Sequence, residues 1–340
     1  MGQQYQNAIV AGTCIKSEDT LAPETPITSC VALALLSCCF PQKGAMNMRW
    51  KRLFVVSTIL LAQGMAGGQT SKIDPVLMRK AAAGDAQAQY LVGHAYVEGK
   101  SSEPDYLQAA EWYEKAADQG LAPAQFELGL LFHSGQGVTQ SDTRAALLYR
   151  RAAEQGLAIA QLSLAALYDQ GRGVQQDYAE AAGWYRKAAL QGLAEAQLDL
   201  GMLYERGVGV PQDYAQAADL YRRAAEQGNA AAQFNLGLLY DNGQGVQRDY
   251  AKAASWYIKA AEQGLPRAQY NLGSMYSQGQ GVEKSYTDAY YWLDLAADNW
   301  SGVHQQEAIR ARNSVGTKMS VSEVKEAMER TQKWLAEHRK

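Results

Sequence analysis

The chain has 340 residues, of which 47% are hydrophobic and 20% are charged, and its formal net charge is −3. This composition is typical of a folded protein, and the charge gives no basic footprint for binding nucleic acid. All four cysteines fall within residues 14–39, so neither disulfides nor thiolate metal sites can stabilise the rest of the chain.

Residues 46–66 have the features of a secretory signal peptide. A basic stretch over 49–52 precedes a short apolar run over 53–62, and Gly64 and Ala66 supply the small residues of a cleavage site. The apolar run is shorter than the roughly 20 residues of a membrane-spanning helix. We therefore expect cleavage after Ala66, a periplasmic or secreted mature chain, and no integral membrane span in that mature chain.

The residues before this segment need an explanation, because a signal peptide begins its chain. The simplest one is that translation starts at Met46 or Met48. Residues 1–45 would then be an upstream extension of doubtful reality, expected to be disordered. The alternative is a genuine N-terminal extension with a buried or membrane-associated stretch at residues 30–40.

From Ala86 to Trp300 the sequence repeats with a period of 36 residues. A fixed period of this size indicates a solenoid of stacked supersecondary units rather than one centred core. The function should therefore be sought on a repeated surface rather than in a single pocket. The six units cover residues 86–121, 122–157, 158–193, 194–229, 230–265 and 266–300.

Each unit begins with a predicted helix, which the unit starting at Ala230 illustrates. Ala232, Leu236 and Leu239 fall at helical spacing and predict the buried stripe of this first helix. Gly237 lies in the same stripe, and only Gly or Ala occurs at its position in the other units. This restriction predicts that another backbone passes close to the first helix there.

A glycine-containing loop and a second helix complete the unit. Gly243 is placed to end the first helix in the left-handed conformation, and Gly245 follows it in the loop. The string G-x-G-V lacks the preceding strand and the Lys-Ser/Thr ending of a phosphate loop, so it indicates a helix–helix turn. Asp249 is placed to cap the second helix, whose apolar rows contain Trp256 and Tyr257.

One polar residue recurs inside the apolar first helix. Gln233 has a glutamine counterpart in each of the other five units. A buried amide needs hydrogen-bond partners, so we expect this glutamine to bridge to the loop or backbone of an adjacent element. The counterparts are Gln89, Gln125, Gln161, Gln197 and Gln269.

The repeat resembles the Sel-1-like repeat, a relative of the tetratricopeptide repeat. The resemblance is carried by A-x-A-Q-x-x-L-G-x-x-Y-x-x-G-x-G-V followed by D-Y-x-x-A-x-x-W-Y-x-x-A-A-x-Q-G, over Ala86–Trp300. Two units depart from it. The first has Ser101 in place of the second loop glycine, and the second has Asp142 where tyrosine is expected. The resemblance implies an all-α, right-handed superhelix of six 36-residue helix-turn-helix units, with first helices lining a concave face, and a scaffold or adaptor role.

Segments at both ends of the array are expected to cap it, because a terminal unit would otherwise expose its apolar face. Residues 75–84 read as a lone second helix that would cover the first unit, within a solenoid domain spanning 72–300. Residues 301–340 are expected to form C-terminal capping helices over 305–315 and 321–338. Ser320 and Glu323 form a capping box for the last helix, and its buried stripe is expected at Val324, Ala327 and Trp334.

Signals for catalysis or for a bound cofactor are weak. The histidines are scattered without ligand-like spacing, so we expect no metal, no cofactor and no catalytic residue. Ser322 and Lys325 match the S-x-x-K motif of penicillin-recognising enzymes, but the other motifs of those enzymes are absent. Ser322 also lies at a predicted helix start, where serine is expected for capping.

A binding face is the stronger candidate site. Positions two, six, nine and thirteen of the first helices stack on one side and vary between units, whereas the packing positions do not. Amide side chains there can bond both groups of an extended peptide backbone, and tetratricopeptide relatives use asparagines in this way. By that resemblance Asn235 and Asn271 are the first candidates. The full predicted partner-binding set is Glu127, Ser163, Asp199, Met202, Arg206, Asn235, Leu238, Asn242, Asn271 and Gln278.

Three functions remain open from the sequence. The first is a non-enzymatic scaffold in the cell envelope or outside the cell, binding protein or peptide partners through the concave face and not binding nucleic acid. The second is a secreted enzyme that binds or hydrolyses β-lactams through Ser322. The third is a cytoplasmic regulatory adaptor whose N-terminus is not cleaved.

Overall fold

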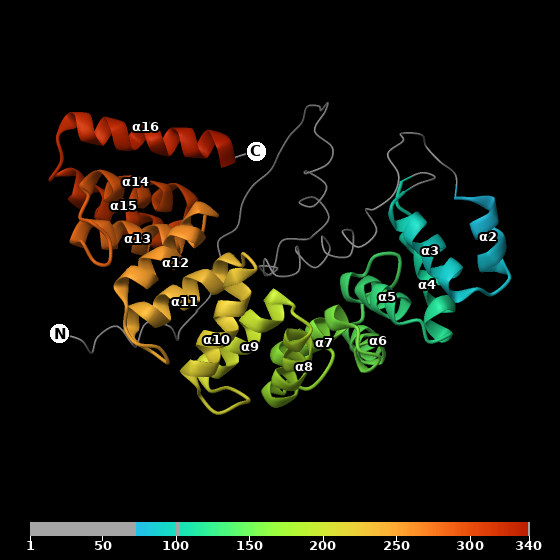
Figure 1. The fold of residues 1–340 in the computed structure, drawn as a ribbon. Coiled ribbons are helices and arrows are strands. Elements are labelled where there is room, and N and C mark those ends of the chain that lie inside the picture. Colours follow the sequence, from blue (N-terminus) through green and yellow to red (C-terminus); the bar gives the residue numbers. More distant parts are fainter. Residues whose placement is uncertain (1–72, 100–102, 339–340) are drawn as a thin grey trace, which may run out of the picture. The chain divides into compact units, whose positions relative to one another are not determined.

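The computed structural model describes residues 73–99 and 103–338, and the predicted extension, signal peptide and Ser101 lie outside this part. Every regular element in the described part is a helix, as expected for a solenoid of helix pairs (Figure 1). The first helices of the units are α3 (Ala86–Val97), α5 (Ala122–Ser134), α7 (Ala158–Gln170), α9 (Ala194–Arg206), α11 (Ala230–Asn242) and α13 (Pro266–Gln278). The second helices are α4 (Tyr106–Asp118), α6 (Asp142–Glu154), α8 (Tyr178–Leu190), α10 (Tyr214–Glu226), α12 (Tyr250–Glu262) and α14 (Tyr286–Asn299).

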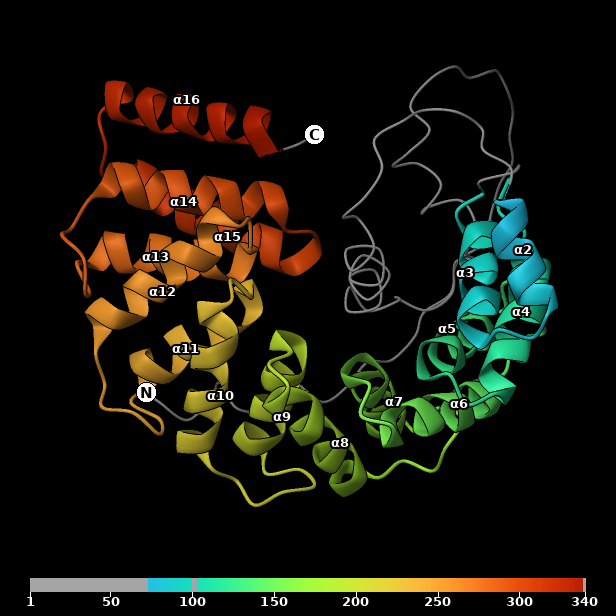
Figure 2. The same cartoon turned by 45° about the vertical axis from the view of Figure 1, so that its right-hand side comes forward.

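Each first helix packs on the second helix of its own unit and on the second helix of the preceding unit. Figure 2 shows how consecutive pairs follow one another along the array. The helix ends confirm the predicted caps. The Asp249 side chain accepts the Lys252 backbone N–H at 3.0 Å, and Gly243 ends α11 at a φ of 70°.

A buried tyrosine lies at the centre of each of the first five units. Tyr257 of α12 is fully buried against Gly237 of α11, where an added Cβ would lie 2.7 Å from the tyrosine ring. The nearest neighbour at Gly237 is thus an aromatic ring, and the predicted backbone also passes there, with the Ala253 carbonyl oxygen 3.4 Å from the added Cβ. The equivalent tyrosines, each no more than 1% exposed, are Tyr113, Tyr149, Tyr185 and Tyr221.

A closer backbone approach occurs at the second loop glycine. Gly245 has a φ of +66°, and a Cβ there would lie 2.2 Å from the carbonyl carbon of Tyr214 in the preceding unit. The loop of one unit thus rests directly on the start of the second helix before it. Glycines in the same contact are Gly137, Gly173, Gly209 and Gly281.

The recurring glutamine joins neighbouring units by hydrogen bonds. The Gln233 amide donates to the Ala225 carbonyl of the preceding unit at 3.1 Å, and the Gln263 amide donates to the Gln233 side-chain oxygen at 2.8 Å. Both bonds of this buried side chain are therefore satisfied within the protein, which confirms the predicted bridge. The same donation to the preceding unit is made by Gln89, Gln125, Gln161, Gln197 and Gln269.

The pattern of glutamine bonds continues into both ends of the array. Helix α2 (Pro75–Ala82) buries Ala81, whose carbonyl accepts from Gln89, so α2 acts as the predicted lone second helix. At the other end, Gln305 of α15 (Gly302–Gly316) donates to the Ala297 carbonyl at 3.0 Å. Helix α15 is therefore the first helix of an incomplete seventh unit.

Helix α16 (Val321–His338) lies alongside α14 in both views of the molecule (Figures 1 and 2). Its capping box forms as predicted, with the Ser320 N–H donating to Glu323 at 2.6 Å and the Glu323 N–H donating to Ser320 at 3.3 Å. Ala327 is buried, and Arg330 pairs with Asp288 of α14 at 2.9 Å.

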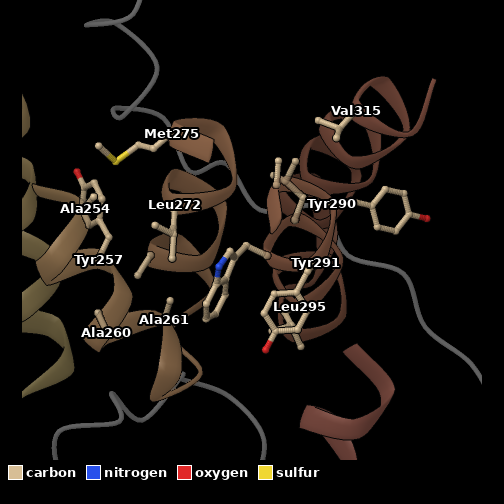
Figure 3. Close-up of a cluster of buried hydrophobic side chains, with 14 of the residues drawn as sticks. Ala254, Tyr257, Ala260, Ala261, Leu272, Met275, Tyr290, Tyr291, Leu295 and Val315 are labelled. Atoms are coloured by element: carbon tan, nitrogen blue, oxygen red, sulfur yellow. The ribbon is translucent and has the colours of Figure 1, made fainter. Parts of the chain in front are cut away.

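The sequence of α14 explains why further helices cover this end. Helix α14 carries Tyr290 and Tyr291 at the positions of Ala254 and Ser255 in α12. The guanidinium of Arg330 lies 4.4 Å from the centre of the Tyr291 ring. Figure 3 shows these rings on one side of the α13 residues and the alanines of α12 on the other. Larger side chains on α14 thus extend the core outward to α15 and α16.

Candidate functional site

The candidate site is the surface that positions six, nine and thirteen of the first helices form, which we call the first-helix face. The structure separates the predicted residues on this face by exposure. Residues at position thirteen are exposed, namely Arg206, Asn242 and Gln278. Half-buried ones are Glu127, Met202, Asn235, Leu238 and Asn271.

Ser163 and Asp199 lie inside the stack rather than on its surface. Ser163 is 0% exposed and Asp199 is 3% exposed, so a partner cannot touch either side chain in this conformation. Residues at position six lie closer to the second helix of the preceding unit than the helical spacing of the sequence indicated. The part of the predicted set that a partner can reach is therefore centred on positions nine and thirteen.

In units four and five the central tyrosine connects this face to the core. The Tyr221 hydroxyl donates to Glu205 of its own unit at 2.5 Å and also hydrogen-bonds Asn235 of the next unit. Tyr257 makes the equivalent bonds with Asp241, at 3.3 Å, and with Asn271.

These bonds change the interpretation of the two predicted asparagines. Asn235 and Asn271 already use their amides inside the protein, on the hydroxyls of Tyr221 and Tyr257. Burial raises the pKa of both tyrosines well above its ordinary value, and the adjacent Glu205 or Asp241 carboxylate raises it further. Both hydroxyls therefore stay protonated and remain hydrogen-bond donors. The asparagines contribute to the fold, and their role in holding a peptide stays a prediction.

The first two units lack this arrangement. Position twelve, which supplies the carboxylates Glu205 and Asp241, is Val97 in the first unit and His133 in the second. The hydroxyls of Tyr113 and Tyr149 are buried and form no hydrogen bond. Both lie close enough to Glu127 for its charge to raise their pKa, after the larger effect of burial.

His133 takes part in an ion cluster on the neighbouring loop. Its Nδ1 lies 2.7 Å from Asp142, and Asp142 accepts two hydrogen bonds from Arg172 of the next unit, at 2.9 and 3.1 Å. Burial and the Arg172 charge lower the pKa of His133, while Asp142 opposes this shift. Asp142 replaces the tyrosine of the repeat, so this departure from the pattern forms a bond between two units.

The residues of the S-x-x-K motif do not form a nucleophile and its base. The Ser322 Oγ lies 3.0 Å from the Ser320 Oγ, and the exposed Lys325 pairs with Glu329 at 3.6 Å. Within residues 73–99 and 103–338 no group of His, Cys, Asp and Glu side chains is arranged to hold a metal ion. None of the helices in these ranges is both long and apolar enough to cross a bilayer.

Comparison with known proteins decides the family. The sequence model of the Sel1 repeat matches six consecutive segments, residues 86–121, 122–157, 158–193, 194–229, 230–265 and 266–299. The chain belongs to the Sel1 repeat family. Sel1 repeat proteins typically mediate protein–protein interactions, and their fold is generally a non-catalytic scaffold.

Solved Sel1 structures share the fold. The chain is similar to c5321, a protective antigen present in uropathogenic Escherichia coli strains, with 34% identity and a TM-score of 0.68 over 77% of this chain. The match spans 56% of the length of c5321. A Sel1 repeat protein from Oxalobacter formigenes is 36% identical, with a TM-score of 0.61, over 66% of this chain and 92% of that one. None of the curated proteins compared with this chain matches it.

Sequence reasoning missed the polar role of the central tyrosine. Tyrosine occurs at the same position of the second helix in five units and leucine, Leu293, in the sixth. An apolar residue would fill the space equally well, so the recurrence of a hydroxyl was a signal for a bonded partner. The residues that bond this hydroxyl, at positions six and twelve of the first helices, differ between units. They could have been found by comparing the units at those two positions.

Proposed function

We propose that this Sel1 repeat protein is a non-catalytic adaptor that binds a protein partner through its first-helix face, in the cell envelope or outside the cell. The observation that carries the proposal is the contrast between positions. Residues that pack are nearly the same in every unit, whereas position thirteen changes from the half-buried Ser134 to the exposed Gln170, Arg206, Asn242 and Gln278. A surface that varies on an otherwise uniform stack supports selective recognition of a partner.

The proposed location rests on the signal-peptide pattern over residues 46–66. The similarity to c5321, a protective antigen, also supports an exported chain, because antibodies reach proteins outside the cytoplasm. N-terminal sequencing of the protein from its native cell tests this part of the proposal. We expect a mature end near Gly67, and an intact N-terminus would instead favour the cytoplasmic adaptor.

Crosslinking and affinity capture of the full mature chain test the binding face. The informative variant is R206E/N242K, which changes the charge of two exposed residues on the first-helix face. The matched control is K333E, which reverses an exposed charge on α16, a helix outside the set of first helices. We expect wild type and K333E to capture the same proteins and R206E/N242K to lose them. Equal capture by all three, or none above background, would contradict the proposal.

A further inference from the structure

Position nine of the first helices is accessible in only part of the array. In units one to three its side chains are buried, each no more than 8% exposed, namely His94, Leu130 and Ala166. In units four to six they are half-buried, namely Met202, Leu238 and Ser274. At this position, apolar side chains are therefore open to a partner only on α9 and α11.

Helix α9 adds a second apolar residue and a cation to this open surface. Leu198, Met202 and Arg206 follow one another at intervals of about one helical turn, so they lie on the same side of the helix. Leu198 and Met202 are half-buried and pack against the core of units four and five, which limits their mobility. Arg206 is exposed at the C-terminal end of this row.

Helix α11 extends the row into unit five. Leu238 occupies the position of Met202, and Asn242 occupies that of Arg206. Leu238 is half-buried and packs against the next part of the core. We call Leu198, Met202 and Leu238, together with Arg206, the α9–α11 strip. It combines an anchored apolar surface with one positive charge at its edge, as in the centre and rim of a protein interface.

The guanidinium of Arg206 is available to a ligand. Within residues 73–99 and 103–338 it forms no hydrogen bond, ion pair or ring contact. The adjacent carboxylate, Glu205, is turned toward the buried Tyr221 and accepts its hydroxyl at 2.5 Å. Because Arg206 is exposed, water satisfies its N–H groups in the free protein, and a partner can replace that water with a carboxylate.

Arg206 also differs in charge from its surroundings. It is the only arginine or lysine of α5, α7, α9 and α11, whereas these helices carry six carboxylates. A partner carboxylate is attracted at Arg206, but one unit away on either side it meets the uncharged Gln170 or Asn242. Repulsion by the other carboxylates disfavours those shifted positions, so a single cation determines where an acidic segment binds.

We propose that the α9–α11 strip holds a segment of the protein partner in which an apolar side chain lies next to an aspartate or glutamate. The apolar side chain packs on Met202 and Leu238, and the carboxylate accepts hydrogen bonds from the Arg206 guanidinium. This inference rests on the proposed adaptor function and specifies the chemistry of the partner. Methionine suits the apolar part, because its flexible thioether adapts to the shape of a ligand.

The two parts of the strip depend on each other. An exposed ion pair contributes little to affinity by itself, because water screens it. An apolar side chain seated on Met202 and Leu238 excludes water from the neighbouring Arg206, which strengthens its bonds to the carboxylate. Loss of either part should therefore weaken binding of the whole segment.

Selection from a phage-displayed library of random 15-residue peptides, against the full mature chain, tests the inference. The informative variant is R206E, and the matched control is R151E, which makes the same change at an exposed position of α6, a second helix. Thermal denaturation of each variant establishes that it is folded. We expect wild type and R151E to enrich peptides with Asp or Glu beside an apolar residue, and R206E to bind those peptides about tenfold more weakly or worse.

A reciprocal exchange of charge provides an independent measurement. An enriched peptide whose acidic residue is replaced by lysine should bind R206E more tightly than it binds wild type. The folded double variant M202A/L238A should also bind the original peptide about tenfold more weakly.

Three results would overturn the acidic–apolar segment and leave the adaptor function standing. They are enrichment of peptides without an acidic residue, equal binding of the enriched peptides by wild type and R206E, and failure to enrich any peptide above the bare support. The adaptor function itself fails only if affinity capture from the native cell also returns no protein above background.

Discussion

The contact between loop and preceding helix at Gly245 leads to a sharp prediction about stability. Gly245→Ala and Gly228→Ala both place a Cβ on a residue with positive φ, at +66° and +88° respectively. At Gly228 nothing lies within 4 Å of the added atom, so the cost is mainly conformational. The left-handed conformation costs about 1–2 kcal/mol for alanine. About 0.4–1 kcal/mol of this is offset because alanine restricts the unfolded chain.

The two substitutions differ in the space around the new atom. At Gly245 the Cβ would lie 2.2 Å from the Tyr214 carbonyl carbon, so two backbones must separate. Overpacking of this kind adds about 1–3 kcal/mol. We therefore expect the unfolding free energy to fall by about 1 kcal/mol for Gly228→Ala and by about 3 kcal/mol for Gly245→Ala.

Urea denaturation followed by circular dichroism measures this difference. Hydrogen exchange read by mass spectrometry locates it, and we expect protection to fall first at the start of α10 and in the loop after α11 in Gly245→Ala. A loss of stability in Gly228→Ala equal to or larger than that in Gly245→Ala would refute the proposed close contact between units. Unchanged exchange at the start of α10 would refute it as well.

Three further predictions concern buried polar groups. Gln233→Leu should lower the unfolding free energy by about 1–2 kcal/mol, because it removes the bonds to Ala225 and Gln263. Urea midpoints check this value, and an unchanged midpoint would contradict it. In the same assay Tyr257→Phe should destabilise by about 1 kcal/mol, whereas Tyr149→Phe should be neutral or stabilising, because only the Tyr257 hydroxyl is hydrogen-bonded. The folded-state pKa of His133 is lowered, so wild type should lose stability as pH falls below 6.5, the ordinary histidine value. This loss should shrink in His133→Gln, and identical pH profiles of the two proteins would contradict it.

Much of the fold was predictable, because comparison of the six repeats shows which residue types occur at each position. The helix ends at Gly243 and Asp249 follow from local backbone chemistry, which acts within a few residues. The bridging role of Gln233 follows from the need to satisfy a buried amide. The nearest neighbour of Gly237 could not be predicted. Small residues at this position of every unit show that little space is available there, but they do not show which group occupies it.

The candidate site was less predictable than the fold. Helical spacing placed Ser163 and Asp199 on the same stripe as Asn235, and that stripe does exist. Spacing does not show how deeply the preceding second helix covers position six, and this depth determines whether a partner can reach it. Differences along the array, such as Val97 in place of Glu205, determine which tyrosine hydroxyls find partners, and they appear only when distant units are compared in three dimensions.

The contacts at Gln233 and Gly245 have a consequence for how such chains change in evolution. Each joins a unit only to its immediate neighbour, and each uses residues that recur at the same position of other units. Loss of residues 194–229 would bring Gln233 against Ala189 instead of Ala225, with the same kind of bond. In-frame duplication or deletion of a whole unit therefore creates no foreign junction. The number of units, and with it the length of partner that the array can span, can change by recombination while every packed position stays as it was.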